Sequence, residues 1–466
     1  MVAPWDRRED KERERASELL LRSWLPAVAR FSPYWAERVR GLGMDTTNFV
    51  DRDALTRLAP VRELDIQRVG GDGAPALLMR PTIEQVKALA TGSVMSTFLG
   101  SIRRDGTQGA RHALLTEYKP IHVHRAGAAN DLAISYSRSD LDRLHRCGAR
   151  AAAVLGLDDT DYLVSAVPAG PTLDFFGVYH LALGSSMLAL HPRGHGDPVD
   201  RVVDSFALLP ATAVAVHADE AIALADVLAA ADANTARVDT VILVGPPPSE
   251  SVREQIREAW HQAGATEADL KVRALYAPPE ARALWAEDST GGLVTYPDLE
   301  VLEVLDPVTL EPADGPGELV ITSAGWHGTA LLRFRTGVLV DQLGVTEADG
   351  RRVPRLLGPV VPHAWQPRVA GGDGTRHVLD IRGIAAAAAS LPIETWRGEL
   401  RGPTTRIKGD RFIVELGGDL GEEQLEAARQ ELASETGVWP ATVKAVDPTV
   451  VNTKISEDRA AFVDLR

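Results

Sequence analysis

The chain has 466 residues, which favours two domains over one, and its hydrophobic (45%) and charged (25%) fractions are typical of a globular protein rather than a disordered one. A net charge of −15, without a basic stripe, argues against nucleic acid as a partner. The single cysteine, Cys147, excludes a disulfide framework and a cysteine zinc cluster.

The N-terminal residues 1–15 are charged and lack an apolar core, so they do not form a signal peptide. No run of about 18 apolar residues occurs, and we therefore expect a cytoplasmic protein without membrane contact. Residues 10–42 carry apolar side chains at helical spacing, which predicts one or two amphipathic helices. Residues 81–118 predict another helix and then a Gly/Arg/Thr-rich loop at residues 100–112.

The middle of the chain alternates helices with short apolar runs. A helix is predicted from residue 139, where Ser and Asp form a typical cap. The apolar runs that follow are DYLVSAV (161–167), SSMLALH (185–191), ATAVAVH (211–217), DTVILVG (239–245) and KVRALY (271–276). Such alternation predicts parallel strands in an α/β core.

The pattern changes after residue 290. Residues 291–345 favour antiparallel strands joined by Asp-Pro and Asp-Gly turns. Residues 366–376 are polar and glycine-rich, which indicates a linker. The remaining stretch of about 90 residues alternates strands and helices and predicts a small α+β domain.

Residues 297–339 carry a D-P-V-T-L-E-P turn, the strand G-E-L-V-I-T and then R-F-R-T-G. This segment resembles the adenylate-forming (acyl/aryl-CoA ligase) superfamily, within it the phenylacetate–CoA ligase-like branch. The sequences VILVGPPPSESVREQIREAW (241–260), YAPPE (276–280) and VLDIRGI (378–384) are similar to motifs of the same family. The resemblance covers nearly the whole chain.

The resemblance implies an α/β fold of two domains. Residues 1–375 would form a large adenylate-forming-like domain with the acyl pocket. Parallel-rich sheets flanked by helices and an antiparallel distorted barrel would build it. Residues 376–466 would form a small, mobile α+β domain that acts as a lid.

The motifs that hold ATP in this family are degenerate here. The family's phosphate loop is rich in Ser, Thr and Gly and carries a lysine. The corresponding residues 124–131, HRAGAAND, lack hydroxyls and lysine, Asp131 would repel a phosphate, and Arg125 is not at the lysine's position. Val338 replaces the aspartate that holds the ribose, and Asp341 would lie on the other face of the strand.

Other positions keep the residue type that the resemblance implies. Glu280 corresponds to the glutamate that helps to bind magnesium, and Tyr276 corresponds to the aromatic residue that covers adenine. The further remnants of the nucleotide site are Arg335, Thr336, Arg382 and Lys454, the last of which is placed like the family's C-terminal catalytic lysine. For Lys454 the alternative of a solvated tail lysine stays open.

Residues 169–184 resemble the family's substrate-binding loop and helix. The implied acyl or aryl pocket would be lined by Asp174, Phe175, Phe176, Tyr179 and His180, with Gly245 and Tyr276 from strand ends. His217 also ends a predicted strand, where open α/β sheets carry their reactive groups. We interpret His217, His180 and Glu280 as candidate catalytic residues, because a histidine can act as a general base near neutral pH. Helix capping by His217 and core packing by Phe175 or Phe176 are the alternatives.

His122 and His124 alternate and so share one strand face. A third metal ligand is not apparent in the sequence, so packing is favoured over a metal site. We predict no metal site and no cofactor, and Mg²⁺ (at Glu280) and ATP belong only to a ligase hypothesis.

Loss of the nucleotide contacts beside a retained acyl pocket favours a repurposed enzyme. It would hydrolyse or transfer an amide or (thio)ester acyl group without ATP, in specialised metabolism. One alternative is an ATP/Mg-dependent acyl- or aryl-CoA ligase, with adenylation followed by thioesterification. The other is a non-catalytic binding or scaffold protein. The expected partner is a small acyl or aryl molecule, and we allow for a homodimer.

Overall fold

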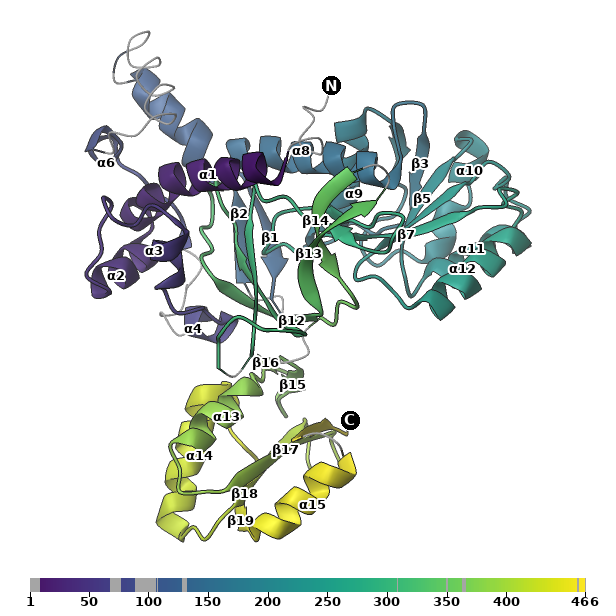
Figure 1. Ribbon diagram of the computed structural model, residues 1–466. Helices are drawn as coiled ribbons and strands as arrows, with labels where there is room; N and C mark the ends of the chain where they lie inside the picture. Colours follow the sequence, from purple (N-terminus) through teal and green to yellow (C-terminus); the bar gives the residue numbers. More distant parts are fainter. Residues whose placement is uncertain are drawn as a thin grey trace.

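The computed structural model describes residues 9–67, 77–88, 106, 108–127, 132–307, 309–348, 351–362, 366–458 and 461–465 (Figure 1). The chain begins with the helices α1 (Asp10–Phe31), α2 (Pro33–Gly41), α3 (Arg52–Thr56), α4 (Glu63–Gln67) and α6 (Ile83–Ala88). The predicted helices in residues 10–42 are confirmed, and the indole N–H groups of Trp24 and Trp35 tie them to the carbonyls of Trp326 and Ala330. Residues 108–118 are helical, so the end of the predicted loop at 100–112 is helix instead.

A six-stranded sheet forms the centre of the N-terminal part. Its strands, in spatial order, are β4 (Leu188–Leu190), β3 (Tyr162–Ser165), β5 (Ala213–His217), β6 (Thr240–Val244), β7 (Lys271–Tyr276) and β8 (Trp285–Ala286). All neighbours are parallel except β7 and β8, which confirms the predicted parallel core. The helices that accompany the sheet are α8 (Arg138–Leu155), α9 (Leu173–Ser185), η2 (Val199–Val202), α10 (Ser205–Leu208), α11 (Ala221–Ala230) and α12 (Glu250–Gln262). Strands β5 and β6 are almost wholly apolar because helices cover them.

Antiparallel strands lie against this sheet, and those within residues 291–345 confirm the prediction for that stretch. The antiparallel strands are the pair β1 (His122–Ala126) and β2 (Leu132–Tyr136); the sheet of β10 (Val301–Leu305), β11 (Gly317–Thr322) and β12 (Phe334–Val340); and the sheet of β13 (Gln342–Ala348), β14 (Arg351–Leu357) and β9 (Leu293–Val294). The turn between β10 and β11 begins at Asp306, whose carboxylate accepts a hydrogen bond from the backbone N–H of Thr309 at 2.8 Å. The register of β11 and β12 shifts between Glu318 and Val320, where a bulge opens the pair.

The C-terminal part has a core of its own. The hairpin of β15 (Arg368–Ala370) and β16 (Arg376–Val378) leads into α13 (Arg382–Ala389), β17 (Thr395–Arg401), β18 (Arg411–Gly417), α14 (Glu422–Thr436), β19 (Thr442–Val446), α15 (Pro448–Asp458) and β20 (Phe462–Asp464). The helices flank the sheet of order β19-β18-β17-β20 (Figure 1). Val369, Leu379 and Phe412 belong to one apolar cluster. The boundary predicted between residues 375 and 376 and the predicted linker therefore fall on a β-hairpin.

The observed architecture is the predicted mixed α/β fold. Parallel strands and their helices adjoin antiparallel sheets in the larger part, and the smaller part is α+β. Among the described helices, none is both long and apolar enough to cross a membrane.

Candidate active site

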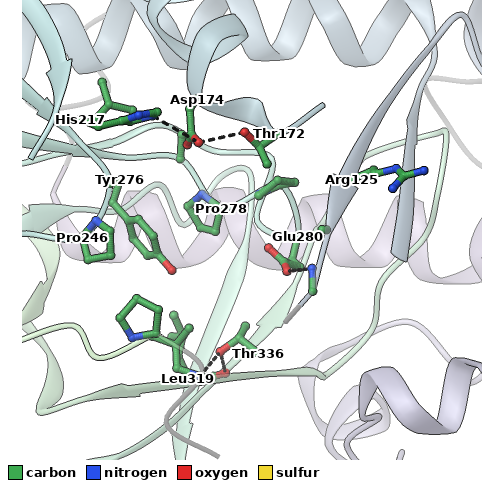
Figure 2. A pocket seen from close by; sticks show the side chains of 18 of the residues that line it. Arg125, Thr172, Asp174, His217, Pro246, Tyr276, Pro278, Glu280, Leu319 and Thr336 are labelled. Atoms are coloured by element: carbon green, nitrogen blue, oxygen red, sulfur yellow. Dashed lines mark hydrogen bonds and ion pairs between the residues drawn. The ribbon is translucent and has the colours of Figure 1, made fainter. Parts of the chain in front are cut away.

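A cavity of about 470 Å³ opens at the carboxyl ends of β5, β6 and β7, the edge at which parallel sheets carry ligands (Figure 2). His217, Gly245 and Tyr276 come from these strand ends. Strands β11 and β12 close the opposite side. The lining residues that the described part of the chain supplies are Arg125, Ala126, Gly127, Thr172, Asp174, His217, Ala218, Asp219, Val244, Gly245, Pro246, Tyr276, Ala277, Pro278, Pro279, Glu280, Leu319, Ile321, Thr336, Val338 and Pro362.

His217 and Asp174 form an ion pair on one wall of this cavity. The His217 Nε2 lies 3.7 Å from the Asp174 Oδ2, and the Thr172 hydroxyl donates to the same oxygen at 2.9 Å (Figure 2). Asp174 stands in the first turn of α9. Its carboxylate raises the pKa of His217, although partial burial lowers it. The arrangement is that of a histidine oriented by a carboxylate, as general bases commonly are.

Glu280 and Tyr276 lie in the same cavity. Glu280 is 6% exposed, and its Oε1 accepts a hydrogen bond from the backbone N–H of Gly127 at 2.7 Å. Burial raises the pKa of the Glu280 carboxyl, against the opposing effect of its backbone hydrogen bonds. Tyr276 is 9% exposed, and burial raises the pKa of its hydroxyl, which therefore stays protonated.

The turn after β1 corresponds to the predicted phosphate loop. Of the corresponding residues 124–131, residues 124–126 end β1 and Gly127 follows them, whereas residues 128–131, and with them Asp131, lie outside the described residues. Gly127 has φ +79°, and a Cβ built there would lie 2.4 Å from the carboxylate oxygens of Glu63. Glu63 is fully buried. Two carboxylates, those of Glu63 and Glu280, thus approach the backbone of this turn.

Sequence reasoning missed Glu63. It begins the short helix α4, and a lone glutamate at such a position carries no distinguishing pattern. Its approach to Gly127 is a tertiary contact between segments 64 residues apart.

Val338 and Thr336 form the floor of the cavity from β12. Val338 is 4% exposed, so the position predicted to have lost its ribose-binding carboxylate presents an apolar side chain to the cavity. The Thr336 hydroxyl donates to the carbonyl of Leu319 at 2.7 Å and accepts from the Val338 N–H at 3.1 Å. Its hydrogen-bonding capacity is therefore largely used within the protein.

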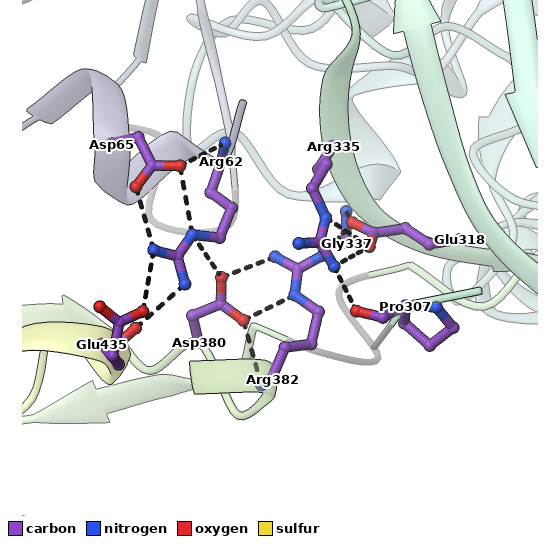
Figure 3. A network of polar contacts seen from close by, with 9 residues as sticks. All are labelled: Arg62, Asp65, Pro307, Glu318, Arg335, Gly337, Asp380, Arg382 and Glu435. Atoms are coloured by element: carbon purple, nitrogen blue, oxygen red, sulfur yellow. Dashed lines mark hydrogen bonds and ion pairs between the residues drawn. The ribbon is translucent and has the colours of Figure 1, made fainter. Parts of the chain in front are cut away.

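Arg335 and Arg382 lie outside the cavity, in a network of charges that joins the two parts of the chain (Figure 3). Both contact Glu318, with 2.8 Å between the Arg335 Nη2 and the Glu318 Oε2. Arg382 also pairs with Asp380, whose Oδ2 lies 3.7 Å from the Arg62 Nε. Both arginines are predicted nucleotide-site remnants. In the structure Arg335 pairs with Glu318 inside the larger part, and Arg382 joins that carboxylate to Asp380 of the smaller part.

The other side chains predicted on α9 lie away from the cavity. Phe175 and Phe176 are partly buried against the core, and Tyr179 is 40% exposed. His180 faces His145, with ring centroids 6.5 Å apart. The reason is the helical period of 3.6 residues, because a helix that turns Asp174 toward the cavity turns most later positions elsewhere.

Lys454 also lies outside the cavity lining. It stands on α15, and its Nζ is 2.7 Å from Glu415 Oε1 on the neighbouring β18. The structure therefore places it within the smaller domain as a half-exposed ion-pair partner.

Comparison with known proteins gave matches to solved structures alone. No protein-family model and no curated protein matches the sequence. The 2-hydroxyisobutyryl-CoA ligase, in complex with 2-HIB-AMP and CoA in the thioesterification state, is 17% identical with a TM-score of 0.60, over 98% of this chain and 90% of that chain. An open conformation of that ligase is 19% identical with a TM-score of 0.58, over 94% and 88%. The chain therefore has the fold of the adenylate-forming ligases, and at this identity the likeness establishes the fold alone.

Proposed function

We propose that this chain hydrolyses or transfers the acyl group of an ester, thioester or amide without ATP, within a fold that its structural neighbours use for ligation. The observation that carries the proposal is the His217–Asp174 pair, which faces a cavity of about 470 Å³. In that cavity a general base, a protonated tyrosine hydroxyl and a binding surface for an acyl group come together.

The same lining fits a nucleoside triphosphate poorly. The carboxylates of Glu63 and Glu280 lie at the backbone of Gly127, where a phosphate would need donors and a cation. Val338 offers no acceptor for a ribose, and the described lining residues include no lysine. Each charge-assisted contact is worth about 1.5–3 kcal/mol, so the loss of two weakens binding by about a hundredfold or more. Glu280 alone corresponds to the magnesium position, and we therefore derive no step through MgATP.

The proposed reaction uses the residues of the cavity. Neutral His217 takes a proton from water, and the water oxygen attacks the acyl carbon to form a tetrahedral intermediate. The Tyr276 hydroxyl donates a hydrogen bond to the oxygen that gains negative charge, because its raised pKa keeps it protonated. The bond to the leaving group then breaks, and the leaving atom takes the proton from His217. The products are the free acid and the protonated leaving group. In transfer, an acceptor hydroxyl, thiol or amine takes the place of water.

The test is a turnover assay on the full chain with aryl and alkyl esters, thioesters and anilides, each with and without MgATP and EDTA. We expect release of acid without ATP, no effect of EDTA, and a loss of about 10²–10⁴-fold in kcat for His217→Ala. His195→Ala is the matched control, because His195 is exposed and does not line the cavity. Acid activation that requires ATP and releases pyrophosphate would refute the proposal.

A ligase is the second candidate, favoured by the likeness to a CoA ligase over 98% of the chain, small domain included. Glu280, Tyr276 and Thr336 also share one cavity, as a nucleotide site of that kind would require. Stabilisation by millimolar MgATP together with pyrophosphate release would favour it over hydrolysis. A non-catalytic role would be supported if the His217→Ala protein kept its full biological function.

A further inference from the structure

The charges around the cavity are unequal. Its lining includes the acids Asp174, Asp219 and Glu280, whereas the basic side chains among the described lining positions are Arg125 and His217. Figure 2 shows the guanidinium of Arg125 pointing away from Tyr276 and Asp174. A cleft lined by one sign of charge concentrates ligands of the opposite sign.

The three acids differ in what already neutralises them. Asp174 is paired with His217, and Asp219 is exposed to solvent. Glu280 is buried, and its carboxyl has the N–H of Gly127 as a donor but no cationic side chain within the described part of the chain. A buried carboxylate without a counter-charge is costly, and the raised pKa of Glu280 reflects that cost. Of the three acids, Glu280 is thus the buried one whose charge is available to pair with a ligand.

An aromatic wall stands beside Glu280. Tyr276 and Glu280 line the same cavity, and burial, followed by the charge of Glu280, raises the pKa of the Tyr276 hydroxyl. Trp285 packs on Tyr276 with ring centroids 5.9 Å apart, which fixes the tyrosine ring. Several prolines complete this apolar side of the lining. An aromatic face next to a carboxylate is the environment that binds organic cations.

We propose that the substrate of this cavity carries an organic cation, such as a primary ammonium group, which pairs with Glu280 beside the ring of Tyr276. The inference rests on the proposed function, since it takes this cavity as the substrate site. It narrows the substrate class to acyl derivatives with a cationic group, and it disfavours carboxylates and phosphates.

The test is a binding measurement that needs no turnover. Benzylammonium, benzyl alcohol and benzoate are probes of similar size and different charge. By calorimetry at pH 7.5 on the full chain, we expect benzylammonium to bind about tenfold or more tightly than either other probe. Glu280→Gln should abolish this preference while the affinity for benzyl alcohol stays within about twofold. Glu250→Gln, on the exposed face of α12, is the matched control and should bind all three probes as the unaltered protein does.

Equal binding of the three probes, preference for benzoate, or an unchanged preference in Glu280→Gln would overturn the inference. Mg²⁺ alone is a further arm. If Mg²⁺ binds at Glu280 and displaces benzylammonium at millimolar concentration, the acid is a metal ligand and the inference is wrong. The outcome is separable from the proposed function: binding without hydrolysis leaves this inference standing, and hydrolysis of neutral esters alone leaves the function standing.

Discussion

His217 takes its chemical character from the residue beside it. The carboxylate of Asp174, 3.7 Å from Nε2, raises the pKa of His217 above its usual value of about 6.5. A general base works in its neutral form, so kcat/KM should fall as the pH drops below this raised pKa. With Nε2 directed to Asp174, Nδ1 is the ring nitrogen that would accept the proton in the proposed reaction.

Asp174→Asn should move the acid limb of the pH–rate profile. Removal of the negative charge lowers the pKa of His217, and we therefore expect the acid limb of kcat/KM to shift to lower pH. Thr172→Val is the matched control, because it removes a hydrogen bond to Asp174 and keeps the charge. An unchanged limb in Asp174→Asn would show that His217 is not the titrating base.

Glu300 is a buried acid that does not line the candidate active-site cavity. It is 2% exposed, and its Oε1 accepts hydrogen bonds from the Trp285 indole at 2.9 Å and the Tyr296 N–H at 2.8 Å. Burial raises the pKa of Glu300 to about 8. The folded protein therefore retains a proton that the unfolded chain releases above the usual glutamate pKa of 4.5, and stability falls as the pH rises from there to about 8.

Glu300→Gln should remove that pH dependence. The amide oxygen can still accept both hydrogen bonds, so we expect little change near pH 4 and a gain of about 2–4 kcal/mol at pH 8. Urea unfolding at pH 4 and pH 8 measures this difference in the free energy of unfolding. Glu250→Gln, at an exposed position, is the control. A loss of stability at pH 8 would mean that Glu300 is ionised in the fold and that its charge is used.

At the scale of elements, the turn between β1 and β2 depends on a glycine. Gly127 has φ +79°, and a Cβ there would meet the buried Glu63 carboxylate at 2.4 Å. Gly127→Ala should cost about 2–3 kcal/mol in the free energy of unfolding, from backbone strain and overpacking together. Gly196→Ala is matched in backbone, with φ +77° and no atom within 4 Å of its Cβ, so it should cost about 1 kcal/mol or less. Equal losses of unfolding free energy in the two variants would show that the Glu63 carboxylate does not pack against Gly127.

A buried histidine on strand β1 should make the stability of the fold sensitive to acid. His124 packs against Tyr136 and Phe176, with ring centroids 5.1 Å and 5.0 Å away, and burial lowers its pKa to about 4. Between pH 6.5 and 4 the unfolded chain binds a proton at this position that the folded chain refuses, so stability falls as the pH drops. His124→Phe should flatten the decline by up to about 3 kcal/mol in unfolding experiments from pH 7 to 4. His195→Gln, at an exposed site, is the control and should leave the decline of stability with falling pH unaltered. If His124→Phe also left that decline unaltered, His124 would already be charged in the folded protein.

Local patterns in the sequence predicted the elements better than the contacts between them. Apolar runs between helices predicted β3, β5, β6 and β7, because buried parallel strands need apolar side chains on both faces. Parallel strands bind ligands at their carboxyl ends, and this rule predicted that His217 and Tyr276 belong to one site. The approach of Glu63 to Gly127, and the way α9 turns His180 from the cavity, depend on tertiary packing that no local pattern encodes.

At the scale of the whole molecule, a chain of opposite charges connects the large part to the small one. Glu318 and Asp380 are fully buried, and Arg382 bridges them (Figure 3). Arg62, from the N-terminal region, reaches Asp380 and the carbonyl of Glu435, the latter at 3.2 Å. Because these carboxylates are inaccessible to water, each depends on its arginine partners. The network should therefore hold the small domain in one orientation.

Arg382→Met should release that orientation. The substitution keeps much of the side-chain volume but leaves Glu318 and Asp380 buried with fewer partners, so we expect a loss of about 3–5 kcal/mol in the free energy of unfolding. The two parts can escape this penalty by separating, which would raise the radius of gyration in small-angle scattering and speed proteolysis at residues 366–376. Arg401→Met is the matched control, since the half-exposed Arg401 pairs with Glu399 inside the small domain and should cost about 1 kcal/mol or less. If Arg382→Met lost stability without any change in scattering or proteolysis, the network would contribute to stability but would not set the domain orientation.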